Sequence, residues 1–238
     1  MSFASFRFTD ASLFYNGFSI EEAKTLDPLS HYNSISVYPR PLLRNLFNNP
    51  QYRRMYLAHI RTIMEENFSN QNYYNRGFYF QALTNLSVLN DTNKFYTYAD
   101  FQNNLYGTVS DFIDYPGIVD LMQGRVAYLS GYPGFQGAPD IDNVSVFPEA
   151  PVLNDILSIT AQVSNASKVI LFYRTRPDIV FQELLMNDEG TDGDELSGDS
   201  IFSSQLLFQG RDVDYYIYAE NDSAGAFLPK RAAYEYFK

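Results

Sequence analysis

The side chains best suited to chemistry are concentrated in an acidic loop at residues 187–199, which reads NDEGTDGDELSGD. Calcium takes several oxygen ligands from a loop that glycine allows to turn sharply. With Asp188 at position one of a twelve-residue calcium loop, Asp192 falls at position five and Asp199 at position twelve. The match is incomplete because position three is Gly190 and position twelve lacks the bidentate glutamate. The candidate metal ligands are Asp188, Asp192, Asp194 and Asp199.

The same loop can also be read as a solvated connection between two strands. Aspartate, asparagine and glycine favour turns for reasons of their own, without any bound ion. The incomplete ligand set leaves both interpretations open: a calcium site in the acidic loop, or a loop that is simply exposed to water.

Side chains for acid–base or nucleophilic catalysis are scarce. His31 and His59 are the two histidines, and no Ser or Asp is spaced to form a catalytic triad with either. Cysteine is absent, which excludes thiol catalysis, disulfides and cysteine-based zinc sites. Because His59 lies beside the apolar face of a predicted helix, we expect it to pack or to face solvent. The sequence therefore assigns no catalytic residue.

Three arginines are candidates for holding a phosphate group: Arg53, Arg54 and Arg61. Arginines at helical spacing beside acids commonly form surface ion pairs of small energy, so we expect these three to face solvent. Glu65 and Glu66 are neighbours on a helix, point about 100° apart and do not share a site, so we expect them to form a solvent-exposed face. Neither common glycine-rich phosphate loop occurs, and the sequence assigns no cofactor-binding residue.

The composition is that of a folded protein. The 238 residues are 45% hydrophobic, with 20 Tyr, 20 Phe and no Trp. Tyrosine rings can line a carbohydrate groove or build a core, and the sequence does not separate these two readings. No apolar run approaches the length of a membrane span, and residues 1–10 lack the features of a signal peptide.

The charge distribution argues against nucleic acid as a partner. The net charge of −11 divides into −2 on residues 1–140 and −9 on residues 141–238. Nucleic acid is bound by a basic surface that releases counterions, and neither half of the chain supplies one.

Helical spacing dominates the first part of the chain. Asn48 and Asn49 precede Pro50, so a short polar side chain can cap a helix that begins at Pro50, whose missing N–H costs nothing in the first turn. The apolar spacing predicts that this helix runs to residue 68 and buries one stripe of side chains. That predicted stripe comprises Tyr52, Met55, Tyr56, Ile60, Ile63, Met64 and Phe68.

Further helices and one strand are expected around this central helix. A short strand is predicted around Phe3, Phe6 and Phe8 from their alternation. Helices are predicted at residues 20–26, at 70–89 with an interruption at Gly77, at 98–112 and at 118–129.

In the second part of the chain, apolar residues alternate with polar ones at a period of two, which is typical of β-strands. Residues 131–151 contain four prolines and three glycines and read as a linker. Strands are predicted at residues 144–147, 156–163, 168–173, 179–186, 201–208, 213–219 and 232–237. We therefore expect an α+β protein: a helical lobe at 1–130, the linker at 131–151 and an antiparallel immunoglobulin-like β-sandwich at 152–238.

Several ordered segments carry a resemblance to a known family. They are PLLRNLF at residues 41–47, a short Asn/Pro break, QYRRMYLAHIRTIMEENF at 51–68, NDTNKFY at 90–96 and GRVAYL at 124–129. In this order they resemble the C-terminal lobe of the CotH-type kinases, the spore coat protein H family. The likeness covers residues 1–130, whereas residues 140–238 resemble immunoglobulin or fibronectin type III domains of bacterial surface proteins.

The resemblance implies a fold and an activity for a complete parent protein. Such a parent would transfer phosphate from ATP with magnesium, using a metal-binding Asp-x-Asn motif that would lie before Met1 with the rest of the nucleotide-binding lobe. We therefore expect a fragment that is not a competent kinase, that contacts an upstream kinase lobe or another protein, and that resides outside a bacterial cell or on its surface. The alternative is a non-catalytic adhesion or glycan-binding module.

Overall fold

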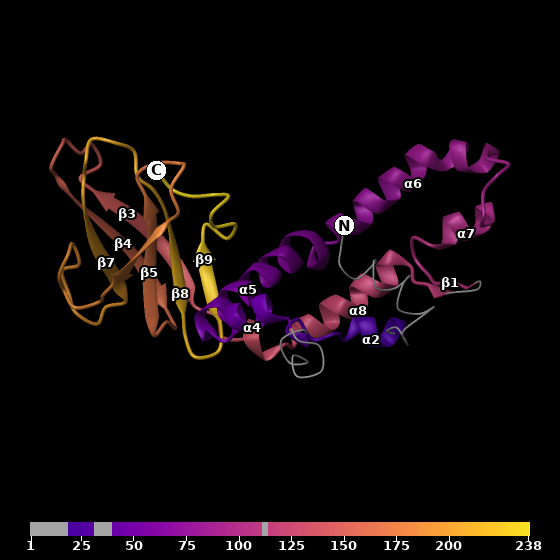
Figure 1. The fold of residues 1–238 in the computed structure, drawn as a ribbon, viewed down its shortest axis with the longest axis horizontal. Helices are drawn as coiled ribbons and strands as arrows, with labels where there is room; N and C mark the ends of the chain where they lie inside the picture. Colours follow the sequence, from indigo (N-terminus) through magenta and orange to yellow (C-terminus); the bar gives the residue numbers. More distant parts are fainter. Residues whose placement is uncertain (1–18, 31–39, 111–113) are drawn as a thin grey trace. The chain divides into compact units, whose positions relative to one another are not determined.

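The computed structural model describes residues 19–30, 40–110 and 114–238 (Figure 1). The chain forms two compact units. The first, the helical unit, comprises Met1–Tyr38 and Ile63–Tyr132, and the second, the sheet unit, comprises Pro39–Thr62 and Pro133–Lys238. The predicted strand around Phe3, Phe6 and Phe8 lies outside the described residues. Helices and antiparallel sheets both contribute, as expected for an α+β protein.

The helical unit is built from short helices with defined ends. Its elements are α2 (Ile20–Lys24), the π-helix η1 (Met64–Ser69), α6 (Asn72–Asn90), α7 (Tyr98–Asn103), the two-stranded ladder of β1 (Val109–Ser110) and β2 (Asp114–Tyr115), and α8 (Ile118–Ser130). Capping boxes begin α2 at Ser19 and α7 at Thr97, where a hydroxyl and a carboxylate satisfy free backbone N–H groups. The helices predicted at 20–26 and 118–129 are confirmed.

Two predicted helices have different bounds in the structure. The helix α6 is continuous across Gly77. The glycine serves packing there, because a Cβ atom at Gly77 would lie 2.8 Å from Leu105 Cδ1. The helix predicted at 98–112 ends at Asn103, since Val109 and Ser110 pair with β2. Apolar spacing alone did not reveal these tertiary contacts.

Polar contacts hold α2 against α8. Lys24 Nζ lies 2.9 Å from an Asp120 carboxylate oxygen, and the Tyr132 hydroxyl donates to the Asp27 carboxylate at 3.0 Å. The Arg125 guanidinium donates to the carbonyl of Leu26 at the C-terminal side of α2. These bonds join chain segments about one hundred residues apart.

The sheet unit contains two antiparallel sheets around one core. Its strands are β3 (Asp140–Phe147), β4 (Ile156–Ser164), β5 (Lys168–Arg174), β6 (Gln182–Met186), β7 (Ile201–Leu207), β8 (Asp214–Glu220) and β9 (Gly225–Leu228). One sheet has the order β3-β4-β7 and the other β6-β5-β8-β9. Residues of both sheets, among them Ile159, Val163, Leu171 and Ile217, form one buried apolar cluster.

Two sequence expectations for this unit need correction. The strand predicted at 232–237 is not formed, and the last strand is Gly225–Leu228. The small residues at the start of this strand, Gly225 and Ala226, give no β-strand signal in the sequence. Position 225 requires glycine's missing side chain, because a Cβ atom there would lie 2.6 Å from the Tyr218 hydroxyl oxygen. The expected linker at 131–151 contains the strand β3, which starts at Asp140.

The sheet unit also includes two helices, α4 (Pro41–Phe47) and α5 (Pro50–Ile63), which the sequence had placed with the helical lobe. As predicted, α5 begins at Pro50, and Asn49 Oδ1 accepts from the N–H of Gln51 at 2.9 Å. The predicted end was wrong in detail, because the α-helix changes to a π-helix at Met64.

The predicted buried stripe was wrong in part: Met64 is buried and Met55 packs against a core cluster, but Tyr52, Tyr56 and Ile63 are exposed. Leu57, Ala58 and Thr62 are the buried residues of α5, whereas Tyr52 and Ile63 are 40% and 52% exposed. Ala58 belongs to a second buried cluster with Ile170, Phe172, Tyr216, Tyr218, Phe227 and Ala232. A small residue at Ala58 allows the helix to approach the β6-β5-β8-β9 sheet closely.

A buried ion pair joins α5 to β8. Arg54 Nε donates to Glu220 Oε2 at 2.9 Å, and the Tyr218 hydroxyl donates to the same oxygen at 2.8 Å. The Arg54 side chain is 20% exposed and that of Glu220 5% exposed. Burial would raise the pKa of Glu220, but the hydrogen bonds from Arg54 and Tyr218 outweigh it and hold the pKa below its ordinary value.

The Arg54–Glu220 pair predicts the effect of removing one partner. Arg54→Ala leaves a carboxylate buried without its cation, so we expect the free energy of unfolding to fall by about 3 kcal/mol. Urea unfolding followed by circular dichroism measures this change. Arg76→Ala, at an exposed position of α6, is the matched control and should stay within about 0.5 kcal/mol of the unsubstituted chain. Equal losses in the two variants would contradict a buried pair.

The same pair predicts a pH dependence. A carboxylate whose pKa is lowered on folding contributes stability above its unfolded pKa, ordinarily 4.5, and loses that contribution as the pH falls through the lower folded value. We therefore expect the stability difference between the unsubstituted chain and Glu220→Gln to shrink between about pH 5 and pH 3. Urea midpoints across this range give the difference. A constant difference across the range would disprove the assignment.

Candidate functional sites

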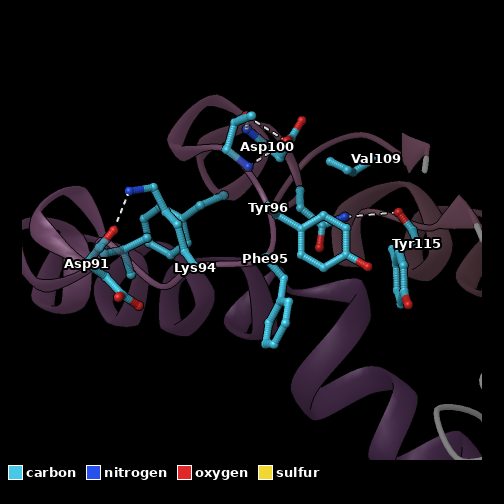
Figure 2. A pocket seen from close by; sticks show the side chains of 11 residues that line it. Asp91, Lys94, Phe95, Tyr96, Asp100, Val109 and Tyr115 are labelled. Atoms are coloured by element: carbon cyan, nitrogen blue, oxygen red, sulfur yellow. Dashed lines mark hydrogen bonds between the residues drawn. The ribbon is translucent and has the colours of Figure 1, made fainter. Parts of the chain in front are cut away.

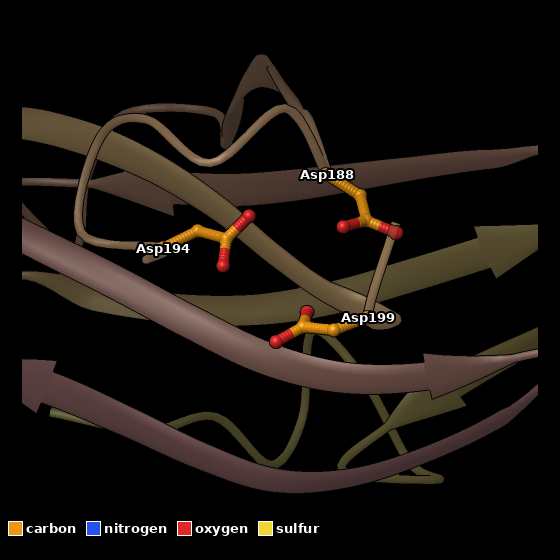
Figure 3. Close-up of side chains that lie close together, drawn as sticks. All are labelled: Asp188, Asp194 and Asp199. Carbon is orange, nitrogen blue, oxygen red and sulfur yellow. The ribbon is translucent and has the colours of Figure 1, made fainter. Parts of the chain in front are cut away.

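Three of the four predicted metal ligands lie together in the acidic loop. Asp188, Asp194 and Asp199 each provide a carboxylate oxygen, and these oxygens lie within 4.8 Å of one another. The three side chains point toward one another (Figure 3). Asp194 is buried, Asp188 is partly buried and Asp199 is exposed.

Backbone N–H groups of the loop fix the orientation of these carboxylates. Asp188 accepts from the N–H groups of Gly198 at 2.8 Å and Ser200 at 3.1 Å. Asp194 accepts from Gly190 at 2.9 Å and Leu196 at 3.1 Å. The loop therefore folds around its own acids.

Asp192, the fourth predicted ligand, lies outside this group. Its carboxylate accepts from the side-chain amide of Asn187 at 3.2 Å, and its backbone has a positive φ of 58°. Asp192 was placed at position five of a calcium loop by its spacing in the sequence, but it is not part of the group. Instead, Asp194 converges with Asp188 and Asp199.

The donor set suits a hard divalent cation. Three carboxylates supply oxygen ligands and formal negative charge, which are what calcium and magnesium prefer. The backbone N–H groups offset part of that charge, so the loop is also satisfied without an ion. The geometry therefore brings together three carboxylates that could hold a cation, in a loop where each of them already accepts backbone N–H bonds.

The helical unit contains an aromatic pocket with a volume of about 390 Å³ (Figure 2). The residues that line it include Phe95, Tyr96, Phe101 and Tyr115. Tyr96 and Tyr115 meet edge to face, with ring centroids 5.5 Å apart. Ligand sites commonly combine such apolar walls with a few polar groups.

Three charged residues also line this aromatic pocket. Lys94 Nζ donates to the carbonyls of Leu89 and Asp91, at 3.4 and 2.6 Å. Asp100 completes the capping box of α7, where Oδ2 accepts from the Thr97 N–H and hydroxyl at 2.9 and 2.6 Å. Those bonds lower the pKa of Asp100, the hydroxyl bond most, so the side chain remains ionised at neutral pH.

Sequence reasoning missed this pocket as a site. The tyrosines are spread along the whole sequence, and residues 90–96 stand out there only as one segment of the family resemblance. A local signal was present: four aromatic residues and two acids fall within residues 91–101, at the junction of α6 and α7. That signal acquires meaning only when Tyr115 and Val109 close the other side.

The sheet unit has a separate cavity of about 430 Å³. Core side chains of both sheets, including Leu157, Ile159 and Tyr215, form part of its wall, and Glu149, Asp212 and Lys238 also line it. No constellation of a nucleophile and a base is evident among the residues that line this cavity.

The arginines predicted to face solvent are engaged with protein groups. Arg54 pairs with Glu220, Arg53 donates to the carbonyl of Phe47, and Arg61 Nη2 donates to the carbonyl of Gly225 at 2.8 Å. The expectation of solvent-facing arginines was therefore wrong: their side chains hold the sheet unit together.

The histidines and the glutamate pair have no evident chemical role. His59 stacks on Phe227 with ring centroids 4.5 Å apart, as a packing residue would. His31 lies outside the described residues. Glu65 and Glu66 lie in the π-helix and are partly buried, which differs from the exposed face expected for them.

No protein-family model matches the chain, and no curated protein matches it significantly. Among the described residues, no helix has the length and apolar character needed to cross a membrane.

Proposed function

We propose that this chain is a non-catalytic scaffold segment of a CotH-like protein kinase, with the two sheets serving as an accessory surface for contacts. The observation that carries the proposal concerns residues 39–62. They contain PLLRNLF and most of the following helix, which are two of the segments that carry the resemblance. They form α4 and nearly all of α5 and belong to the same compact unit as the sheets. Residues 39–62, which are one part of the resembling stretch, therefore belong to the same compact unit as the sheets, and this supports a role for them as scaffold.

The strand order supports the proposal that the sheets form an immunoglobulin-like or fibronectin type III-like sandwich. If β3 to β9 correspond to strands A, B, C, C′, E, F and G, one sheet carries A, B and E and the other C′, C, F and G. This order places the central pair C and F side by side, as in immunoglobulin domains. The bacterial, extracellular or cell-surface location remains part of the same proposal and rests on the resemblance.

The proposal predicts that this chain alone does not turn over ATP. Phosphoryl transfer requires a phosphate cradle, bound metal and a positioned base. The candidate arginines of α5 are bonded to protein groups. We expect phosphate release from ATP with magnesium or manganese to equal that of the heat-denatured chain, measured over hours with purified protein. Turnover well above this blank would show that the active site has been misplaced.

A second candidate function is a non-catalytic adhesion or glycan-binding module. The specific observation in its favour is the exposure of large aromatic side chains in the helical unit. Phe78, Tyr79 and Phe80 of α6 are 54%, 61% and 53% exposed, and Phe95 is 98% exposed. Exposed aromatic surface of this extent is more typical of contact surfaces than of a purely internal scaffold.

We also propose calcium as the ion of the acidic loop. Asp188, Asp194 and Asp199 offer only oxygen ligands, and calcium accepts the irregular coordination that a loop provides. Such an ion would stabilise the loop between β6 and β7 and would have no role in chemistry.

Calcium binding should raise the stability of the chain. At a calcium concentration about ten times the dissociation constant, the free energy of unfolding should rise by about 1.4 kcal/mol. Asp199→Asn should abolish the increase, whereas Asp192→Asn, in the same loop but outside the converging group, should retain it. Thermal unfolding with calcium, with magnesium and with a chelator provides the measurement. The same response in both variants, or no response to calcium, would rule out the site.

A further inference from the structure

We propose that the aromatic pocket of the helical unit binds a neutral sugar ring. The proposal rests on the second candidate function, glycan binding, and goes beyond it by naming the site and the ligand class. The pocket combines exposed aromatic faces with an ammonium group and two carboxylates at the junction of α6 and α7 (Figure 2).

The apolar part of the pocket suits the C–H faces of a sugar. Phe95 is 98% exposed, so its ring is available to a ligand, and Tyr96 is 38% exposed. The edge-to-face contact of Tyr96 with Tyr115 holds the Tyr96 ring in a defined orientation. Val88 and Val109 complete an apolar wall. An apolar ring face stacked here would be removed from water, which favours binding.

The polar groups retain hydrogen-bonding capacity toward a ligand. Both bonds that Asp100 accepts from Thr97 end at Oδ2, so Oδ1 is oriented but not used in them. Asp91 likewise accepts from the Asn93 N–H through Oδ1 alone. Lys94 Nζ donates to two backbone carbonyls, Leu89 and Asp91, and an ammonium group has three N–H donors.

A neutral polyol matches this set of groups better than other ligand classes. A hydroxyl group both donates and accepts, so it can donate to the carboxylates and accept from the ammonium. An anion would face two carboxylates. A cation would be attracted by those carboxylates and by the rings, but it would leave the Lys94 ammonium without a complementary group, and choline tests this alternative. A purely apolar ligand would remove the charged groups from water without replacing their hydrogen bonds, which is costly.

The volume sets the size of the ligand. Ligand sites commonly range over roughly 300–1,000 Å³, and the aromatic pocket, at about 390 Å³, lies near the lower end. It therefore has room for one or two sugar rings and not for a long chain. A terminal sugar of a glycan is the form that such a pocket can receive.

Titration with simple glycosides tests the proposal. The full chain, labelled with ¹⁵N, is titrated with the methyl pyranosides of glucose, galactose, mannose and xylose, and with choline and cyclohexanol as cationic and apolar probes. At least one glycoside should bind at millimolar concentration, with amide shifts at residues 91–104 and 115. Phe95→Ala should weaken that binding about five- to tenfold, and Lys94→Met should also weaken it.

Phe147→Ala is the matched control. It removes the same side chain from an exposed position at the end of β3 that does not line the pocket, and affinity should not change. Because Phe95 is almost fully exposed, Phe95→Ala should keep the fold, which the unperturbed amide spectrum would verify.

The possible failures are distinguishable. Glycoside binding that shifts amides elsewhere and survives Phe95→Ala would overturn the pocket while leaving glycan binding in place. Absence of binding by every glycoside would overturn both. Choline or cyclohexanol binding in the pocket, without any glycoside, would overturn the ligand class.

Discussion

The sheet unit depends on one strand that is buried on both of its faces. Every residue of β8, Asp214–Glu220, is buried. Ile217 and Ala219 face the core between the sheets, whereas Tyr216 and Tyr218 contact the cluster that contains Ala58 of α5. Because both faces of this strand are buried, its side chains must suit a buried environment on each face. The run of tyrosine, isoleucine and alanine provides such side chains.

The two acids that end this strand must have cationic partners. Glu220 pairs with Arg54 of α5, and Asp214 pairs with Arg174 of β5 at 3.0 Å. Arg174 in turn lies over the ring of Phe181, 4.4 Å from its centroid. Because an unpaired buried charge is expensive, these arginines fix the positions of the elements that carry them. The helix α5 therefore belongs to the sheets through electrostatics as much as through apolar contact.

This arrangement separates the roles of the two units. In the sheet unit, Arg53, Arg54 and Arg61 serve cohesion, and the acidic loop is the place where oxygen ligands converge. In the helical unit, aromatic side chains that a closed core would bury remain accessible around the α6–α7 junction. The pocket residues are therefore different from the residues of the buried ion pairs, so substitutions in the pocket need not disturb those pairs.

Helix starts and most strand positions of this protein can be predicted from its sequence alone. Asn49 and Pro50 start α5, and the period of two locates β4, β5, β7 and β8, because capping and side-chain alternation depend only on neighbouring residues. The sequence also indicates that Asp188, Asp194 and Asp199 of the acidic loop can lie together, since their spacing along the chain is short. Tertiary structure decided which face of α5 is buried, because an arginine counts as polar until Glu220 supplies its partner. It likewise decided that Gly225–Leu228 is a strand and that Phe95, Tyr96 and Tyr115 share a pocket, since those contacts join residues whose separation in sequence carries no signal.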